Sequence, residues 1–168
     1  AVEAITGPRS AGDGLVVLIA VVAALAVIIL LCGVCLVFVL DCYEADMDAI
    51  GAFMTESEIG YTTDGAYTVF APDGATKEFI FYPGAKVEHE AYLPLMEACA
   101  DKGILCVLVE MPLYFPLIGS ELAEGVQEKF PEIEDWYIGG HSLGGYAASM
   151  YLDKNLDKFE GLILLASY

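Results

Sequence analysis

Basic residues are scarce in this chain of 168 residues. Lysine and arginine together number 7 against 25 aspartates and glutamates, so the formal net charge at pH 7 is −18. Proteins that bind nucleic acid displace counterions from phosphates with clustered Lys and Arg. The same deficit argues against electrostatic docking on anionic lipid. The composition therefore excludes nucleic acid as a partner and indicates an acidic, solvated surface.

The cysteines follow no disulfide or metal-binding pattern. There are five of them, and an odd number rules out a complete set of internal disulfides. Cys32 and Cys35 have the spacing of a redox or metal pair, but they lie in a long apolar run with no histidine and no second pair. Cys99 and Cys106 are interpreted as small core residues. We therefore expect no metal and no cofactor.

Residues 14–40 contain no charged side chain. A membrane-spanning helix needs about 20 apolar residues, so this run is long enough to span a bilayer with some tilt. The apolar region of a cleaved signal peptide is shorter, about 7–15 residues, and is followed by a small-x-small cleavage site. Neither feature fits here. The run predicts a single transmembrane anchor and hence a location in the cell membrane.

The charges that flank the anchor predict its orientation. Arg9 precedes the anchor, and no lysine or arginine follows it until Lys77. By the positive-inside rule, the N-terminal tail of residues 1–13 lies in the cytoplasm and the rest of the chain is extracytoplasmic. Residues 41–65 are acidic and lack a clear period, and we interpret them as a juxtamembrane linker. Residues 66–168 remain for a globular domain.

The globular part alternates strand-like and helix-like segments. Two strand-like runs flank a Pro-Asp-Gly turn at residues 72–74 and predict a hairpin. Helices are then predicted over residues 88–102, 120–130 and 144–155, and buried strands over residues 104–110, 135–140 and 161–166. The first helix has an apolar face of Tyr92, Leu95, Met96 and Cys99. This order predicts an α/β fold with a mostly parallel sheet and helices on both faces.

The sequence Gly140-His141-Ser142-Leu143-Gly144 is a G-x-S-x-G motif between a predicted strand and a predicted helix. A nucleophilic serine on such a sharp turn has strained backbone angles, and side chains two positions before and after it would collide with the adjoining elements. The turn also places the hydroxyl at a helix N-terminus, which favours developing negative charge. A purely structural glycine turn is the alternative. The flanking strand and helix favour Ser142 as a nucleophile.

The stretch "GGHSLGG" resembles the nucleophile turn of α/β-hydrolases, in the form common among esterases, lipases and thioesterases. Upstream, "FIFYPGAKVEHEAYLPLMEACADKGILCVLVEMP" resembles the third strand, oxyanion loop, first helix and fourth strand of that family. In many members a His-Gly pair begins the oxyanion loop. Here the pair is Pro83-Gly84, which is most similar to a subgroup resembling dienelactone hydrolases and small carboxylesterases. Because the best-known members of that subgroup use cysteine and this chain has Ser142, dienelactone activity is not implied. The resemblance covers residues 66–168.

The resemblance implies roles for particular residues. In the family, the oxyanion hole takes one backbone N–H from the residue after the nucleophile, here Leu143, and one from the loop after the third strand, here Ala85. Each of two such donors typically raises the rate of the chemical step by a factor of about 10² or more. The family order is Ser, then Asp or Glu, then His. Neither His89 nor His141 fits that order, so we expect the triad acid and histidine beyond residue 168, in a chain that is C-terminally truncated.

Together these inferences predict a membrane-anchored serine hydrolase that acts on a small-molecule or lipid-like acyl ester. Two alternatives remain open. One is a non-catalytic hydrolase-fold module that binds a ligand or partner at the cell surface. The other is an acyltransferase, which would use the same residues and differ only in excluding water.

The sequence also predicts that the gene continues past the codon for Tyr168. We expect roughly a hundred further residues, with an Asp after one further strand and a His after the next. Sequencing the locus checks this. A stop codon directly after Tyr168, or an extension without the His, would leave Ser142 without a base and contradict the enzyme hypothesis.

Overall fold

A computed structural model of the chain describes residues 11–54 and 59–167. It divides into two compact units, Ala1–Phe38 and Val39–Tyr168. Helix α1 (Ala11–Leu40) includes the predicted anchor, and Gly12–Leu40 is long and apolar enough to cross a membrane. Arg9 and most of the predicted N-terminal tail, residues 1–13, lie outside the described residues.

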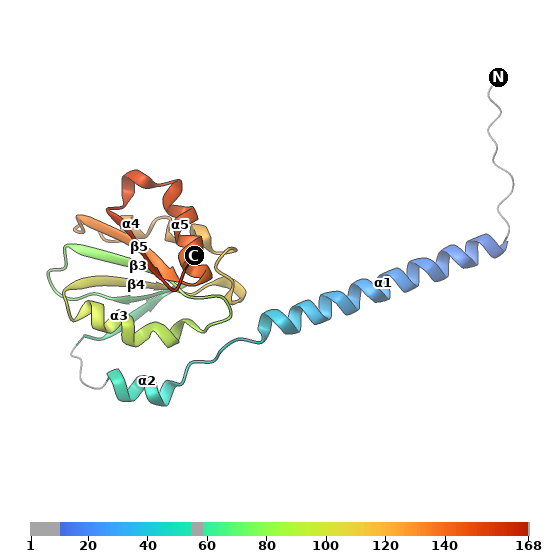
Figure 1. Ribbon diagram of the computed structural model, residues 1–168, viewed down its shortest axis with the longest axis horizontal. Helices are drawn as coiled ribbons and strands as arrows, with labels where there is room; N and C mark the ends of the chain where they lie inside the picture. The colour runs from blue at the N-terminus through green and yellow to red at the C-terminus, as the bar shows by residue number, and fades with distance from the viewer. Residues whose placement is uncertain (1–10, 55–58, 168) are drawn as a thin grey trace, which may run out of the picture. The chain divides into compact units, whose positions relative to one another are not determined.

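Within the described residues, the second unit contains one sheet of six strands in the order β1-β2-β4-β3-β5-β6 (Figure 1). The strands are β1 (Tyr61–Asp64), β2 (Tyr67–Phe70), β3 (Lys77–Tyr82), β4 (Ile104–Val109), β5 (Asp135–His141) and β6 (Gly161–Leu165). Strands β4, β3, β5 and β6 run parallel, whereas β1 and β2 form an antiparallel edge. The sheet confirms the predicted α/β class.

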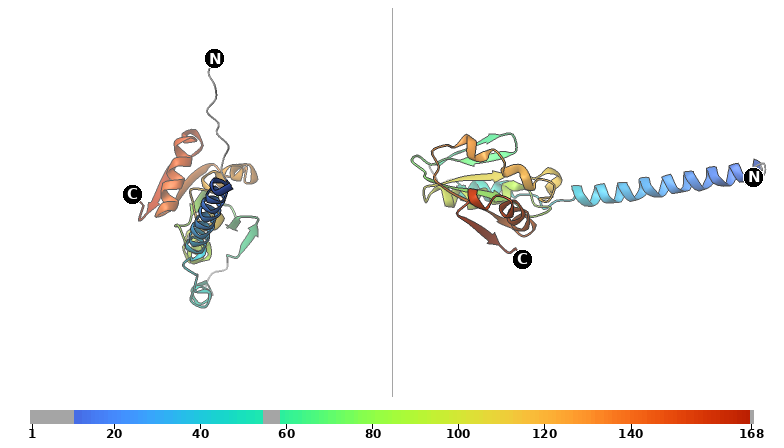
Figure 2. Two further views of the ribbon diagram at one scale, coloured as in Figure 1. Left: turned by 90° about the vertical axis from the view of Figure 1, so that its right-hand side faces the viewer. Right: turned by 90° about the horizontal axis from the view of Figure 1, so that it is seen from above.

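Helices cover both faces of the sheet, as predicted (Figures 1 and 2). Helices α2 (Met47–Met54) and α3 (Leu93–Ala100) pack on one face, and α4 (Val126–Lys129) and α5 (Leu143–Asp153) on the other. Short 3-10 turns η1 to η4 cover His89–Tyr92, Pro112–Tyr114, Ser120–Ala123 and Leu156–Lys158. The second part of strand β3, residues 79–82, is apolar because it is buried on both faces. Phe79 and Phe81 face α3, while Ile80 and Tyr82 face α5.

The predicted hairpin around residues 72–74 is wrong. Strand β4 lies between β2 and β3, antiparallel to the first and parallel to the second. The real hairpin joins β1 to β2 through Gly65, which has a φ of 61°. An Asp-Gly pair between β-prone residues is a strong hairpin signal, and Asp64-Gly65 provides it. The apolar run of β4 takes the central position because it can be buried on both faces.

The expected linker, residues 41–65, contains regular structure. Ile50 of α2 is buried in the core layer beneath α3, and β1 pairs with β2. This part of the chain therefore belongs to the same compact unit as the sheet. The sequence does not predict α2 clearly, because Ile50 is the one buried residue of this helix and a single buried position produces no apolar period.

Two predicted helices differ in detail. The segment 120–130 is split at Gly125, whose φ of 78° is left-handed, into a 3-10 turn and the short α4. In α3 the buried face consists of Leu93, Met96, Glu97 and Ala100 rather than the predicted Tyr92, Leu95, Met96 and Cys99. The helix begins only at Leu93, after a 3-10 turn, because Pro94 suits a first helical turn.

Strand β6, expected to be buried, is exposed over its last three residues. It pairs with β5 along one side, and Ile163, Leu164 and Leu165 are 40%, 47% and 36% exposed. These apolar side chains lie at the edge of the described sheet, which explains their exposure.

Glu78 is a buried carboxyl group in β3. Its side chain is fully inaccessible, and no described residue forms a hydrogen bond with either carboxylate oxygen. Its backbone lies in register with Leu105 and Trp136 of the adjoining strands. Burial, with a smaller contribution from the negative charge of Glu132, raises the pKa of Glu78 to about 9. At neutral pH the group is therefore protonated in the folded protein.

This burial predicts a stability that falls as pH rises. Because the folded pKa of Glu78 lies above its ordinary value of 4.5, its contribution is fully present below about 4.5 and is lost as pH rises toward about 9. The slope reaches about 1.4 kcal/mol per pH unit. We expect Glu78→Gln to flatten this profile and stabilise the chain at pH 8. Urea unfolding of the full chain in detergent micelles measures it, with exposed Glu128→Gln as control. Equal slopes for wild type and Glu78→Gln would contradict the assignment.

Candidate active site

Ser142 is the single residue between β5 and α5. Its backbone angles are φ 50° and ψ −122°, a region that residues with a side chain rarely occupy. Its N–H donates to the carbonyl oxygen of Leu165 at 2.9 Å, and its own carbonyl accepts from the backbone N–H of Gly145 at 3.1 Å and from Ser167 Oγ at 2.8 Å. The strained turn is thus fixed to the carboxyl end of β6 and to the first turn of α5.

The glycines two residues before and after Ser142 allow backbone segments to approach closely. A Cβ atom on Gly140 would lie 2.5 Å from the carbonyl oxygen of Tyr82 and 2.6 Å from the carbonyl carbon of Gly144. A Cβ atom on Gly144 would lie 2.1 Å from the carbonyl oxygen of Pro83. The collision predicted for these positions is present. Its partners include the end of β3 as well as the adjoining helix.

Ala85 and Leu143 lie at the same edge of the sheet as Ser142. Strands β3 and β5 are parallel neighbours, with Tyr82 opposite Gly140, so the segments that leave their carboxyl ends begin side by side. Ala85 lies in the loop after β3, and Leu143 is the first residue of α5. Neither backbone N–H donates to any described carbonyl or side chain. Both therefore remain free to bind an oxygen atom.

Tyr92 connects the loop after β3 to the serine turn. Its hydroxyl oxygen accepts the N–H of Gly84 at 3.0 Å and lies 2.9 Å from Nδ1 of His141. The hydroxyl group of Tyr92 thus bonds to the loop on one side and to the ring of His141, the residue before Ser142, on the other. Burial raises the pKa of Tyr92, which keeps the hydroxyl protonated. The sequence pattern does not reveal this role, since it assigns Tyr92 to an apolar helix face.

Neither histidine is placed as a base for Ser142. The Nδ1 atom of His141 is occupied by Tyr92, and His89 lies 3.2 Å from the carboxylate of Glu90. No described residue forms a hydrogen bond with the hydroxyl group of Ser142. Nor do the described residues contain a group of three or more His, Cys, Asp or Glu side chains that could hold a metal ion.

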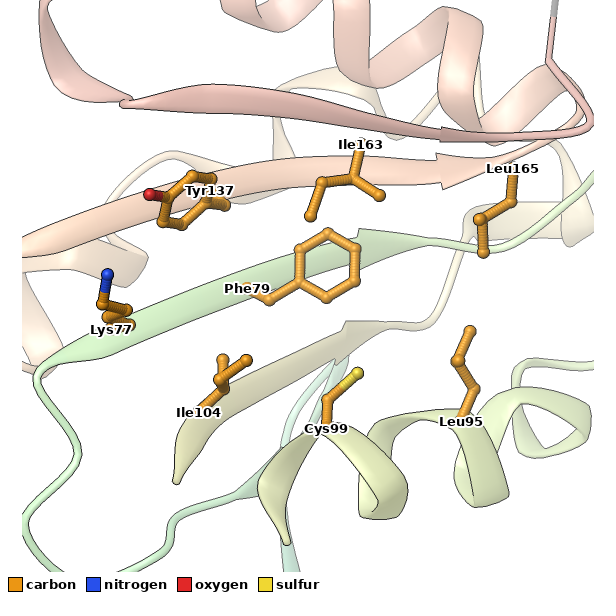
Figure 3. Close-up of a pocket in the computed structure, with 8 residues that line it drawn as sticks. All are labelled: Lys77, Phe79, Leu95, Cys99, Ile104, Tyr137, Ile163 and Leu165. Carbon is orange, nitrogen blue, oxygen red and sulfur yellow. The ribbon is translucent and has the colours of Figure 1, made fainter. Parts of the chain in front are cut away.

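An apolar cavity of about 330 Å³ lies between α3 and the sheet (Figure 3). It is lined by Lys77, Phe79, Leu95, Cys99, Ile104, Tyr137, Ile163 and Leu165. These residues include Leu95 and Cys99 of α3, which the sequence pattern places on the core face. Neither Ser142, Leu143 nor Ala85 lines this cavity. The cavity borders the serine turn at Leu165, whose carbonyl oxygen accepts the N–H of Ser142.

Comparison with known proteins gives one family and one fold. A model described as the alpha/beta hydrolase family matches residues 78–168. The structure of TT1662 from Thermus thermophilus is similar with a TM-score of 0.55 and 15% identity, over 66% of this chain and 58% of that one. The structure of a brefeldin A esterase, described as a bacterial homologue of human hormone sensitive lipase, is similar with a TM-score of 0.50 and 17% identity. The match covers 76% of this chain and 47% of that one.

At these identities the structural likeness shows the fold alone. The chain spans less than two thirds of the length of either structure. A search of curated protein sequences finds no significant match.

The close contact at Gly144 predicts that Gly144→Ala is destabilising. Its new methyl group would meet the backbone of Pro83 and Tyr82, which cannot move without displacing the end of β3. We expect the free energy of unfolding to fall by about 2 kcal/mol or more. Gly51→Ala in exposed α2 is the matched control, because nothing lies within 4 Å of the position that its Cβ atom would take, and it should be neutral or stabilising by up to about 1 kcal/mol. Equal effects of the two substitutions in urea unfolding would contradict the contact.

Proposed function

The chain belongs to the alpha/beta hydrolase family, and we propose that Ser142 is the nucleophile of a serine hydrolase that acts on an ester or related acyl substrate. One observation carries the proposal. Ser142 has a φ of 50° on a one-residue turn from β5 into α5. Strained non-glycine residues cluster at functional sites, where the surrounding structure maintains the strain. Here the neighbouring glycines and the bond to Leu165 maintain it.

In the proposed reaction, Ser142 Oγ attacks the acyl carbonyl carbon and the carbonyl oxygen becomes negative. The N–H groups of Leu143 and Ala85 bind this oxyanion, and the positive end of the α5 dipole adds to its stabilisation. Collapse of the intermediate breaks the ester C–O bond. The departing oxygen takes up the proton that Ser142 gave to the base, so an alcohol leaves and an acyl-enzyme remains. Water then cleaves the acyl-enzyme in the same way, which releases the acid and restores the hydroxyl group of Ser142. A serine needs a base for the first step. We propose that the base is a histidine oriented by an acid, both supplied by residues that follow Tyr168, in the order common to this fold.

We further propose that α1 anchors the enzyme in the cell membrane, with the hydrolase domain on the extracytoplasmic side. Support comes from the length and apolar composition of Gly12–Leu40. The substrate is then a small-molecule or lipid-like acyl ester that reaches the domain outside the cytoplasm.

A binding module without catalysis is the second candidate. It is favoured by the fact that no described residue bonds to the hydroxyl group of Ser142. The two candidates differ in one observable property, since only the enzyme forms a covalent acyl intermediate. Acyl transfer would use the same intermediate and would be recognised by a product formed with an added acceptor alcohol.

The enzyme proposal predicts the effect of removing a single hydroxyl group. In the protein expressed from the complete gene, Ser142→Ala should lower kcat for short acyl p-nitrophenyl esters by at least about 10³-fold, since the nucleophile is lost. Ser149→Ala in α5 is the matched control, because the Ser149 hydroxyl donates to the carbonyl of Tyr146 in its own helix, and its kcat should match the wild type. Activity that survives Ser142→Ala, or a wild type with no activity, would refute the proposal.

A further inference from the structure

The segment that follows α1 pairs with the loop that carries Ala85. Tyr43 and Val87 form an isolated parallel bridge. The N–H of Tyr43 donates to the carbonyl of Lys86 at 2.6 Å, and the N–H of Glu88 donates to the carbonyl of Tyr43 at 3.1 Å. Residues 41–45 thus add a short extra strand to residues 86–88. All of these residues belong to the unit Val39–Tyr168.

Two side chains strengthen this bridge. The carboxylate of Glu88 accepts the N–H of Ala45 at 2.8 Å, and Lys86 Nζ lies 3.3 Å from the carboxylate of Asp41. The side chain of Asp41 is 80% exposed, so this ion pair contributes little by itself. The backbone bridge and the Glu88 contact therefore provide most of the attachment.

The bridge acts on a strained part of the loop. Lys86 has a φ of 59°, which a lysine adopts only when its surroundings hold it there. Its N–H donates to the carbonyl of Tyr114 at 2.7 Å, while its carbonyl receives the N–H of Tyr43. On the other side of Ala85, the N–H of Gly84 is bonded to Tyr92. Ala85 therefore lies between two residues whose backbones are fixed from outside the loop.

We propose that residues 41–45 are a positioning element for the oxyanion hole. Through Tyr43 and Glu88 they hold Lys86 in its left-handed conformation, and this directs the N–H of Ala85 toward the acyl oxygen. The inference rests on the proposed function of Ser142 and extends it to a segment outside the catalytic residues. A cut within residues 41–45, made to release the domain from α1, would then impair catalysis even where the domain folds.

The expected size of the effect follows from the role of the donor. Removing one oxyanion donor costs about 10²–10³ in kcat. A donor that is present but loosely oriented should cost less, so we expect about a tenfold loss or more. The loss should fall on kcat rather than KM, because the oxyanion forms only in the transition state.

The test compares two proline substitutions in the protein from the complete gene, purified in detergent micelles. Tyr43→Pro removes the N–H that donates to Lys86. Glu44→Pro is the matched control: its N–H donates to no described group, and a proline there favours the extended backbone that Tyr43 needs. We measure kcat per active site, titrated with a fluorophosphonate, so that misfolded protein does not enter the rate. Tyr43→Pro should lose about tenfold or more in kcat at a KM within about twofold, and Glu44→Pro should match the wild type.

A second pair of variants keeps the test decisive if Tyr43→Pro does not fold. Glu88→Ala removes the acceptor for the N–H of Ala45, whereas the amide oxygen of Glu88→Gln retains it. We expect kcat to fall in the first and to be restored in the second. Equal kcat values for Tyr43→Pro and Glu44→Pro, or for Glu88→Ala and Glu88→Gln, would overturn the proposal.

Hydrogen exchange separates failure of this inference from failure of the proposed function. In the 168-residue chain, the bonded amides of Gly84, Lys86 and Glu88 should exchange faster in Tyr43→Pro than in the wild type or Glu44→Pro. Unchanged exchange would refute the attachment itself. Faster exchange in a protein whose wild type neither hydrolyses esters nor reacts at Ser142 would refute the enzyme proposal and, with it, the catalytic role of the segment.

Discussion

The architecture depends on the close approach of two backbones, where the first turn of α5 meets the end of β3. At Gly144 the approach leaves no room for a methyl group beside Pro83. This approach is possible only because β5 and β3 are parallel neighbours and the turn at Ser142 takes a single residue. The loop after β3 must also leave the sheet directly after Tyr82. The same contact brings the free N–H of Leu143 and the loop of Ala85 to one edge. Strain at Ser142 is therefore a consequence of the packing that assembles the candidate site.

A second group of interactions fixes the loop after β3, and its members come from three different parts of the chain. Tyr92 binds Gly84 from the turn before α3, Tyr114 binds Lys86 from the loop after β4, and Tyr43 binds it from the segment after α1. A lysine in the left-handed region is strained, so contacts from outside the loop must hold it there. These three hydrogen-bond partners therefore set the conformation of the loop, and through it they affect the position of Ala85 beside Ser142.

The sequence alone is enough to predict the features whose signals are local. The run of β4 and the second part of β3 are apolar because they are buried on both faces. The spacing of the glycines around Ser142 is itself typical of a tight turn. Local signals are insufficient for strand order: the turn at residues 72–74 resembles a hairpin, yet β4 comes between β2 and β3. Contacts such as Tyr43 with Lys86, or Tyr92 with His141, join residues more than 40 positions apart, and nothing in the local pattern of either residue predicts its partner.

The proposed function depends on the hydroxyl group of Ser142 acting as a nucleophile. The most direct measurement is to react the protein from the complete gene with a fluorophosphonate and locate the adduct by peptide mass spectrometry. We expect one phosphonyl group per chain, on Ser142 within the peptide that joins β5 to α5, and none on the other serines. An unmodified Ser142, or an adduct at another residue, would contradict the proposed role of Ser142.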